Sequence, residues 1–330
     1  MAVDRILHTF DHELFLGPYS GSVERCMIEP GNRIIELFRK HSATAIFFVD
    51  STYLTRVEKD DPAAYAKVSD QIGAILDAGC EIGLHLHPHW LDAVASSCQG
   101  WCLEDVSRYR LHALDNETLA HVFATSLESL TRAAKRAGQA ASITTFRAGG
   151  WSLQPFDRLG ELFRKYGIAM DFSVTPGFHK VRLPAHFYDY RQAPKDRAVW
   201  KFSTDPCRPD PGGDLVEVPV TAFRPALPAL VRNHLAIRRG GPVYGDGRGV
   251  VRGRFRELAG KVLAAGAIRQ LTLDMCSRPM LNASLAATAE RTIRSFASHP
   301  KIMTAEALEN LDFLLQNHRT VGSRDLAAMA

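Results

Sequence analysis

The chain has 330 residues, of which 46% are hydrophobic and 23% charged, and its formal net charge at pH 7 is +4. These values are ordinary for a globular protein with a sizeable core, and the length suits two domains or one large α/β barrel. The small surplus of positive charge, without a basic stripe interleaved with aromatic residues, argues against nucleic acid as a partner.

The N-terminus and the cysteines bear on the compartment. Residues 1–13 lack the basic and apolar regions of a secretion signal, and no apolar run reaches the roughly 18 residues that span a bilayer. The six cysteines are scattered without a CxxC or disulfide framework, which favours a reducing environment. We therefore expect a cytoplasmic protein without a transmembrane segment, for which a peripheral membrane contact stays open.

Short apolar runs alternate with helical patterns along the N-terminal half. This alternation is typical of a parallel α/β sheet. A segment without clear periodicity, 90–114, interrupts it, and Asn116 is a good N-cap for a long helix. The predicted strands are 6–10, 43–49, 80–84, 143–146 and 168–174, and the predicted helices are 31–41, 61–77, 117–137 and 156–166.

The C-terminal half is less regular. Residues 175–215 are rich in proline and read as loops, and residues 232–254 combine glycine with arginine. Guanidinium groups suit phosphate, so the second segment is either a solvated basic loop or a site for a diphosphate. The predicted strands are 215–220, 270–274 and 302–303, and the predicted helices are 255–265, 283–298 and 305–316. One domain is expected over 1–317, with a frayed polar tail at 318–330.

Ionisable residues cluster where successive predicted strands end. They are Asp11-His12-Glu13, the trio His85, His87 and His89, then Arg147, Asp171 and Asp274. Side chains from the carboxyl ends of several parallel strands meet at one face, and that face carries the chemistry in such folds. We therefore expect one site that combines these groups.

The three histidines indicate a metal site. On an extended strand end, alternate positions direct all three side chains to one side. If the chain turns helical at Pro88 instead, His85 and His89 share a face. Two histidines and one carboxylate leave a coordination position at which a metal can activate water. A second carboxylate could act as the base and an arginine could orient it, which are the parts for hydrolysing an amide or ester.

These motifs, in this order, resemble the polysaccharide deacetylase family, the NodB-homology carbohydrate esterases. The resemblance covers about residues 6–315. Its elements are Thr9-Phe10-Asp11-His12-Glu13, the apolar strand 43–49, Glu81-Ile82-Gly83 through His85 and His89, Phe146-Arg147-Ala148-Gly149-Gly150-Trp151, and Asp171 within residues 170–174. It implies a distorted, incomplete (β/α) barrel with inserted loops.

Carried over by position, the resemblance implies His85 and His89 as metal ligands, Asp11 as the catalytic base and Arg147 as the residue that orients it. Asp171 corresponds to the fourth motif of the family. The usual third ligand directly follows the base, where this chain has His12. Variants that space the two acids by one residue point to Glu13, which we favour.

The fifth motif of the family, a histidine after the last barrel strand, has no counterpart if that strand is 270–274. His299 is the nearest candidate for the general acid, although the predicted helix 283–298 precedes it. His179 on the proline-rich loop and Asp274 are further candidates.

The resemblance implies a metal-dependent hydrolase that removes an acetyl group from a saccharide. An N-acetyl group is expected in preference to an O-acetyl group. One divalent ion is expected, with zinc as the default and nickel, cobalt, manganese or iron compatible with the same ligands. Without an export signal, a nucleotide-linked or lipid-linked sugar precursor is the expected substrate. The alternatives are a hydrolase of a small non-sugar amide or imide, and a saccharide-binding protein that has lost the general acid.

Overall fold

The computed structural model describes residues 5–96, 100–103, 105, 107–183, 186–248 and 267–330. Its main sheet has nine strands, and eight of them follow one another as neighbours while the ninth, β15, pairs with β1. The order is β10 (Trp200–Phe202), β11 (Leu215–Glu217), β7 (Met170–Asp171), β6 (Thr145–Ala148), β3 (Glu81–Leu86), β2 (Ile46–Asp50), β1 (Arg5–His12) and β14 (Ile293–Ser298), with β15 at Arg319–Thr320.

All neighbouring strands of this sheet are parallel except β10 and β11. The sheet curls into a partial barrel, and within the described residues its two outer strands, β10 and β14, form no ladder with each other. This confirms the predicted distorted, incomplete barrel.

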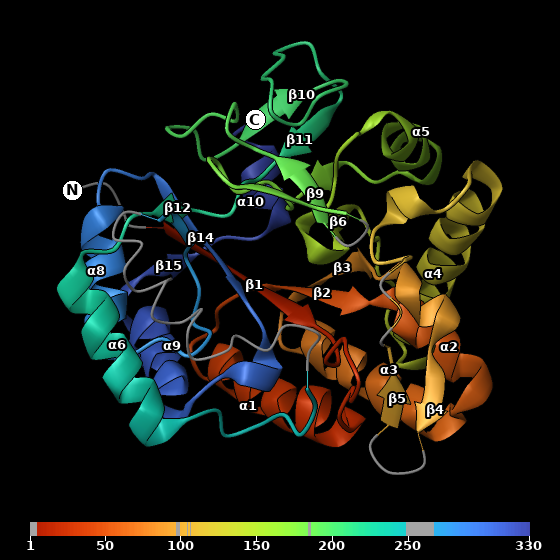
Figure 1. Cartoon of the computed structure of the whole chain (residues 1–330), viewed down its shortest axis with the longest axis horizontal. Coiled ribbons are helices and arrows are strands. Elements are labelled where there is room, and N and C mark those ends of the chain that lie inside the picture. Colours follow the sequence, from red (N-terminus) through yellow and green to blue (C-terminus); the bar gives the residue numbers. More distant parts are fainter. Residues whose placement is uncertain (1–4, 97–99, 104, 106, 184–185, 249–266) are drawn as a thin grey trace.

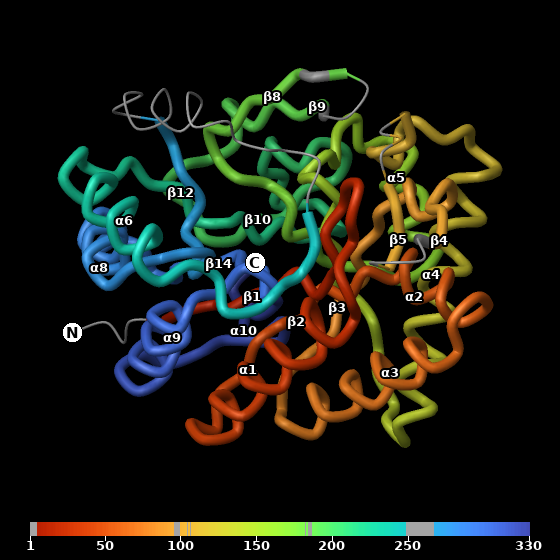
Figure 2. The backbone as a smooth tube through the Cα atoms, turned by 60° about the horizontal axis from the view of Figure 1, so that its bottom comes forward, coloured from red at the N-terminus to blue at the C-terminus, as the bar shows by residue number. Residues whose placement is uncertain are grey.

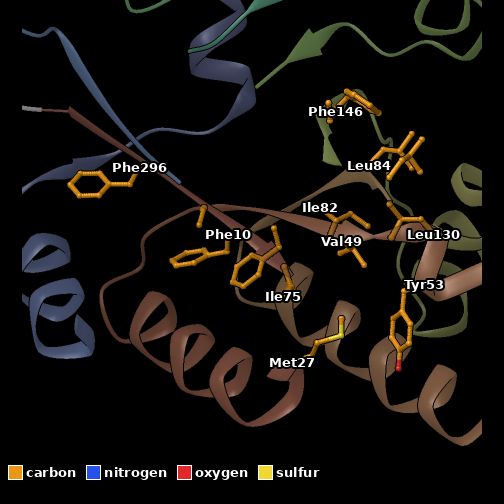
Figure 3. Close-up of a cluster of buried hydrophobic side chains, with 14 of the residues drawn as sticks. Phe10, Met27, Val49, Tyr53, Ile75, Ile82, Leu84, Leu130, Phe146 and Phe296 are labelled. Carbon is orange, nitrogen blue, oxygen red and sulfur yellow. The ribbon is translucent and has the colours of Figure 1, made fainter. Parts of the chain in front are cut away.

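Helices cover the outer face of the sheet (Figures 1 and 2). They are α1 (Glu29–Lys40), α2 (Ser51–Asp60), α3 (Pro62–Asp77), α4 (Asn116–Arg136), α5 (Asp157–Tyr166), α8 (Arg278–Ala287) and α9 (Ala305–Asn317). Between the sheet and the first four helices lies the main core, with Phe10, Val49 and Ile75 among its fully buried side chains (Figure 3). Parallel strands with helices outside them are buried on both faces, which explains the continuous apolar run of β2.

Helix α2 was not predicted. Asp50 ends β2 and also begins α2, because its side chain accepts a hydrogen bond from the Tyr53 backbone N–H at 3.1 Å. This is a standard N-terminal cap, and it converts the strand directly into a helix. The short β2–α2 connection left no loop to recognise in the sequence.

The C-terminal half corrects four predictions. The helix expected over 283–298 is α8 followed by strand β14, which pairs with β1 along six residues from Arg5–Ile293 to Phe10–Ser298. Apolar Ile293 and Phe296 are three apart, a spacing that also suits a helix, and the strand is decided only by its neighbour β1. In place of the strand expected at 302–303, a short 3-10 turn, η5 (Pro300–Ile302), ends at Ile302 and is capped by Met303.

The strand expected over 270–274 is mostly irregular. Only β13 (Arg269–Gln270) pairs, antiparallel, with β12 (Ala222–Phe223). The following residues run beside β14, where the Ala297 N–H donates to the Leu271 carbonyl at 3.0 Å. The last strand of the barrel is therefore β14, and His299 directly follows it.

The tail expected to be frayed is ordered. Strand β15 pairs with β1, and α10 (Ser323–Ala327) follows it. Val321 and Leu326 are buried in a second apolar cluster with Leu7, Ile46 and Phe48, the side chains on the inner face of the curled sheet. Residues 318–330 thus fill one end of the partial barrel.

The inserted segments form small elements of their own. Two hairpins, β4 (Val94–Ser96) with β5 (Gly100–Cys102) and β8 (His179–Arg182) with β9 (His186–Asp189), lie in the segments read as irregular. The arginine-rich segment begins inside α6 (Leu227–Gly240), a helix that was not predicted. Residues 249–254 and the predicted helix 255–265 lie outside the described residues. None of the described helices is long and apolar enough to cross a bilayer.

Candidate metal and acid–base site

The carboxyl ends of β1, β3, β6 and β14 meet at a cavity of about 330 Å³. Their order in the sheet explains the convergence, because β3 lies between β2 and β6 while β14 flanks β1. Asp11, Glu13, His85 and His299 line the cavity together with His87. Part of the predicted group of strand-end residues therefore meets at this cavity.

Glu13, His85 and His87 bring three ligand atoms together. The Nε2 atom of His87 lies 2.7 Å from Oε2 of Glu13 and 2.9 Å from Nε2 of His85. The Nε2 atom of His85 is 3.3 Å from the same carboxylate oxygen. All three residues are buried, and their ligand atoms lie within 4.8 Å of one another. Two imidazoles and a carboxylate of this kind suit a divalent ion such as zinc.

The tautomer of His85 suits this use. Its Nδ1 lies 2.8 Å from the carbonyl oxygen of Arg147, which can only accept a hydrogen bond. The Nδ1 atom therefore carries a proton, and in the neutral ring the lone pair stands on Nε2, the atom that faces Glu13. Histidine ligands to metals are commonly held through their second nitrogen in this way.

His89, the expected second histidine ligand, lies outside this group. The chain leaves β3 after Leu86 and turns into η2 (Pro88–Asp92), which moves His89 away from Glu13. Its ring stacks on Tyr109 with the centroids 5.4 Å apart and the planes 3° from parallel. Burial lowers the pKa of His89 well below its usual range, with the neighbouring His87 adding to the effect. The alternating-strand reading placed all three histidines on one side, whereas the structure brings only His85 and His87 together, because the chain turns helical at Pro88.

The choice between His12 and Glu13 follows from the pleat of β1. Asp11 and Glu13 point to the cavity, and His12 points to the other face of the strand, where its ring contacts Phe47 with the centroids 6.1 Å apart. Burial there lowers the pKa of His12 to about 4. The geometry therefore places Glu13, and not His12, beside His85 and His87.

The guanidinium group of Arg147 fixes the orientation of Asp11. Its Nη1 donates to Oδ1 of Asp11, its Nη2 donates to the Thr9 hydroxyl at 2.7 Å, and its Nε donates to the Phe172 carbonyl at 3.0 Å. Burial raises the pKa of the Asp11 carboxyl, but the charges of Arg147, His85 and His299 together outweigh it and the net shift is downward. Asp11 is thus an ionised carboxylate whose other oxygen, Oδ2, remains directed to the cavity side.

Lys301 was not expected at the site. Its Nζ donates to Oε1 of Glu13 at 2.8 Å and to the Leu14 carbonyl at 2.6 Å. Burial raises the pKa of the Glu13 carboxyl, but the charges of Lys301 and His87 and the hydrogen bonds of His85 and His87 together outweigh it, so the net pKa lies well below the usual range. A single lysine in a C-terminal segment carries no local signal that could have predicted this contact.

His299 completes the polar wall. Its Nδ1 lies 2.6 Å from Oδ2 of Asp274, whose Oδ1 accepts from the His299 backbone N–H at 2.6 Å. Its Nε2 is 3.5 Å from Oδ2 of Asp11. Burial opposes protonation of the ring, but Asp274 dominates and the pKa of His299 rises to about 9. The two residues expected as alternative acids, His299 and Asp274, are in fact partners.

No protein-family model and no curated protein matches this sequence. Solved structures do match. A protein described as a polysaccharide deacetylase from Mycobacterium smegmatis superposes with a TM-score of 0.51 over 100% of this chain and 91% of its own, at 14% identity. The fold is that of the polysaccharide deacetylases. A 4-alpha-glucanotransferase from Thermococcus litoralis shares it with a TM-score of 0.50 at 12% identity, and this chain covers 41% of that longer protein.

Asp171, the counterpart of the fourth motif in the deacetylase resemblance, does not line the cavity. Its two oxygens accept hydrogen bonds from the Ser173 backbone N–H and hydroxyl, each at 2.8 Å. The Ser173 hydroxyl in turn accepts from the Ala148 backbone N–H at 2.8 Å, next to Arg147. Asp171 therefore supports the strand that carries Arg147. The other alternative acid, His179, is an exposed residue of β8 that does not line the cavity either.

Aromatic side chains form much of the remaining cavity wall. Tyr109, Trp151, Phe178 and Tyr188 line it, from segments that the sequence analysis read as loops or turns. The Trp151 ring also covers the Arg147 guanidinium, whose carbon lies 5.1 Å from the ring centroid. Flat aromatic faces next to a polar cluster suit a ligand with an apolar face and hydroxyl groups, a description that a sugar ring satisfies.

Proposed function

We propose that this chain is a metal-dependent deacetylase that acts on an acetylated saccharide or saccharide precursor. The observation that carries the proposal is the placement of an ionised Asp11, held by Arg147, within 3.5 Å of His299 and beside the Glu13–His85–His87 cluster. The fold is compatible with this activity but does not select it, because a glucanotransferase shares the fold.

The donor set fits one divalent ion. Glu13, His85 and His87 would hold it, with zinc the first candidate and nickel, cobalt, manganese or iron compatible. A bound ion of this kind polarises a carbonyl group and makes water more acidic near neutral pH. Lys301 occupies Oε1 of Glu13 and so leaves Oε2 as the ligand atom.

Asp11 and His299 divide the proton transfers between them. Asp11 is ionised, so it can accept a proton from the attacking water, and Arg147, which is itself anchored on the Thr9 hydroxyl, fixes its position. His299, kept protonated by Asp274, can donate a proton to the leaving group. An amine is a poor leaving group unless it is protonated, so a protonated histidine on this side supports an N-acetyl substrate over an O-acetyl one.

Two alternatives remain from the sequence. A small non-sugar amide or imide could use the same polar groups, and the aromatic wall of the cavity favours the sugar. A saccharide-binding protein without catalysis was plausible while the general acid was missing, and the position of His299 after β14 weakens that reading. A purely binding protein also has no use for Asp11 held by a buried arginine.

Acetate release tests the proposal. The purified protein, loaded separately with Zn²⁺, Co²⁺, Ni²⁺, Mn²⁺ or Fe²⁺, would be assayed on N-acetylated and O-acetylated sugars, nucleotide-linked sugars and small amides. We expect acetate from at least one N-acetylated saccharide and a loss of at least 100-fold in Asp11→Asn. Release from small amides alone would replace the saccharide assignment, and metal-loaded protein inactive on every substrate would overturn the catalytic one.

Metal content identifies the ligands independently of activity. We expect about one equivalent in the wild type and loss in Glu13→Gln, His85→Gln and His87→Gln. His12→Gln and His89→Gln are matched controls, since both histidines are buried close by and lie outside the cluster. Retention in His87→Gln together with loss in His89→Gln would restore the ligand set implied by the family resemblance.

A further inference from the structure

A second cavity lies on the outside of the barrel, between α2 and α4, which pack against each other (Figure 1). Its volume is about 400 Å³, within the usual range of small-molecule sites. Trp90 and Leu91 of η2 and Val122 of α4 supply an apolar part of its wall. Among the described residues, none lines both this cavity and the proposed active site, so the α2–α4 cavity is a separate space.

Glu58 of α2 ties the two helices together beside the α2–α4 cavity. Its Oε2 accepts from the Ser129 hydroxyl at 2.8 Å, and the Arg132 guanidinium donates to both of its carboxylate oxygens, each at 2.8 Å. Ser129 follows Thr125, a residue of the cavity wall, by about one helical turn. These bonds fix the spacing of α2 and α4, so the cavity is formed before a ligand arrives, as small-molecule sites usually are.

A buried hydroxyl group in the cavity wall lacks a partner. Ser126 of α4 lines the cavity and is 1% exposed, and its Oγ forms no hydrogen bond within the described part of the chain. The other hydroxyl groups of the wall are engaged. Thr55 and Thr125 each donate to the carbonyl one turn before them at 2.8 Å, and Thr52 accepts from the His87 backbone N–H at 3.1 Å. Burying a hydroxyl without a partner is costly, and a ligand in the cavity would supply the missing bond.

The charges of the wall select the sign of the ligand. Arg56 and Asp60 line the cavity and pair with each other, so their charges cancel. Lys59 lines it as well and is exposed, and its ammonium group has no ion pair or hydrogen bond with any described residue. Counting His121 as neutral, the two cations against one carboxylate give the wall a net charge of +1. A single free cation beside apolar groups suits an organic anion of one charge.

We infer that the α2–α4 cavity binds a small monocarboxylate. Its carboxylate would lie on Lys59, its apolar body against Trp90 and Leu91, and a hydroxyl or carbonyl group on Ser126. A phosphate ester is a poorer occupant, because its charge of nearly two at neutral pH exceeds the one free cation. The arginine-rich segment, considered for a diphosphate from the sequence, contributes no described residue to either cavity.

The α2–α4 cavity adjoins the end of β3 that carries His87. Thr52, which accepts from the His87 N–H, is part of its wall, and Trp90 of the same wall donates from Nε1 to Oδ2 of Asp50 at 2.5 Å. An occupant would therefore contact residues that hold the metal-binding segment in place. The inference goes beyond the proposed function and does not depend on it, because it concerns binding in a separate cavity.

Fluorine NMR of the full chain labelled with 5-fluorotryptophan tests the inference. Of the four tryptophans, Trp90 lines the α2–α4 cavity and Trp151 lines the proposed active site, so their resonances, assigned through Trp→Phe variants, report on the two spaces separately. The probes are 4-hydroxyphenylacetate and 6-hydroxyhexanoate, each compared with its neutral amide. We expect at least one acid to shift the Trp90 resonance, and not that of Trp151, with a Kd of about 1 mM. Its amide should bind about fivefold more weakly.

Two variants assign the contacts. Lys59→Gln should abolish the preference for the acid over the amide, and Ser126→Ala should weaken binding of both about fivefold. Lys135→Gln, which removes an exposed lysine of α4 outside the cavity, and Ser69→Ala, which removes a buried serine of α3, are the matched controls and should leave binding unchanged. Circular dichroism should show all four variants folded.

Three results would overturn the inference. The first is a Trp90 resonance that neither acid shifts at about ten times the expected Kd. The second is a shift of the Trp151 resonance alone, which would place the probes in the proposed active site. The third is equal binding by the Lys59 and Ser126 variants and the two controls.

Discussion

The Nζ atom of Lys301 lies 2.8 Å from Oε1 of Glu13, and both side chains are only 7% exposed. The ammonium compensates a carboxylate that would otherwise be buried with two imidazoles. In the proposed site the bound divalent ion would be a second cationic partner of the same carboxylate. The stability of the metal-free protein should therefore depend on this lysine more than that of the metal-loaded protein does.

Lys301→Met tests this dependence. Removing one partner of a buried ion pair costs about 3–5 kcal/mol, so the free energy of unfolding of the metal-free variant should fall by about that amount. Added Zn²⁺ should raise the Tm of the variant more than that of the wild type, because the ion replaces the lost charge. Lys40→Met is the control, since its pair with Asp312 is largely exposed and worth about 0–1 kcal/mol. Equal zinc-induced shifts in variant and wild type would contradict the argument.

The second prediction concerns the leaving group. His299→Gln should lower kcat/KM for an N-acetylated sugar by about 10²–10⁴, the usual contribution of a positioned general acid. The loss should be smaller for a related O-acetyl ester, because an alcohol depends less on protonation than an amine does. His179→Gln, at an exposed position outside the cavity, should leave both rates unchanged. Equal losses on both substrates would assign His299 a role other than proton donation.

A third prediction concerns the close approach of Gly149 to the histidines. A Cβ atom at this position would lie 2.7 Å from Nδ1 of His87 and 2.3 Å from the Leu86 carbonyl oxygen. Gly149→Ala must therefore shift the His87 ring or the end of β3, and metal affinity should fall about 10–100-fold. Gly240→Ala serves as the control, because nothing lies within 4 Å of its added carbon. Isothermal titration with Zn²⁺ compares the three proteins, and unchanged affinity in Gly149→Ala would argue against His87 as a ligand.

The fourth prediction uses the buried carboxyl pair behind Arg147. Burial, and then the charge of Asp171, raises the pKa of the Glu217 carboxyl well above its usual range. The folded state thus holds this proton more tightly than the unfolded chain does. The resulting stability is present in full below the ordinary glutamic-acid pKa and is lost as pH rises toward the raised one.

Glu217→Gln should remove this pH dependence, since the amide can still donate a hydrogen bond to Asp171 and cannot ionise. The Tm of wild type and variant would be measured from pH 4 to pH 8, roughly the span between ordinary and strongly raised carboxyl pKa values. As pH rises, the Tm of the variant should increase relative to the Tm of the wild type. Parallel curves would mean that Glu217 ionises normally.

The fifth prediction concerns the C-terminal segment. Leu326 of α10 is fully buried against the inner face of the sheet, so Leu326→Ala should lower the free energy of unfolding by about 2–5 kcal/mol. Met329, three residues on, is 39% exposed, and Met329→Ala should change stability by about 0.5 kcal/mol or less. Urea unfolding measures both. A negligible loss in Leu326→Ala would mean that the segment is not part of the cooperative fold.

The sequence by itself determined most strands and helices of the N-terminal half, with α2 an exception, and the ionisable residues at the ends of β1, β3 and β6. Apolar periodicity is a local property, and ionisable residues at a strand end are visible without knowing what lies beside them. Asp11, Glu13, His85 and Arg147 were therefore candidates from the start. The incomplete barrel also followed, through the resemblance that these motifs carry in their order.

Only the tertiary structure decided the C-terminal half and the finer assignments within the site. Residues 293–298 form a strand because β1 supplies hydrogen bonds along their whole length, and that pairing joins segments nearly 290 residues apart. The same pairing turns His299 toward Asp11 and brings Lys301 to Glu13. The turn after β3 selects His87 over His89 for the cluster. Each of these depends on contacts between distant segments, which no pattern of neighbouring residues encodes.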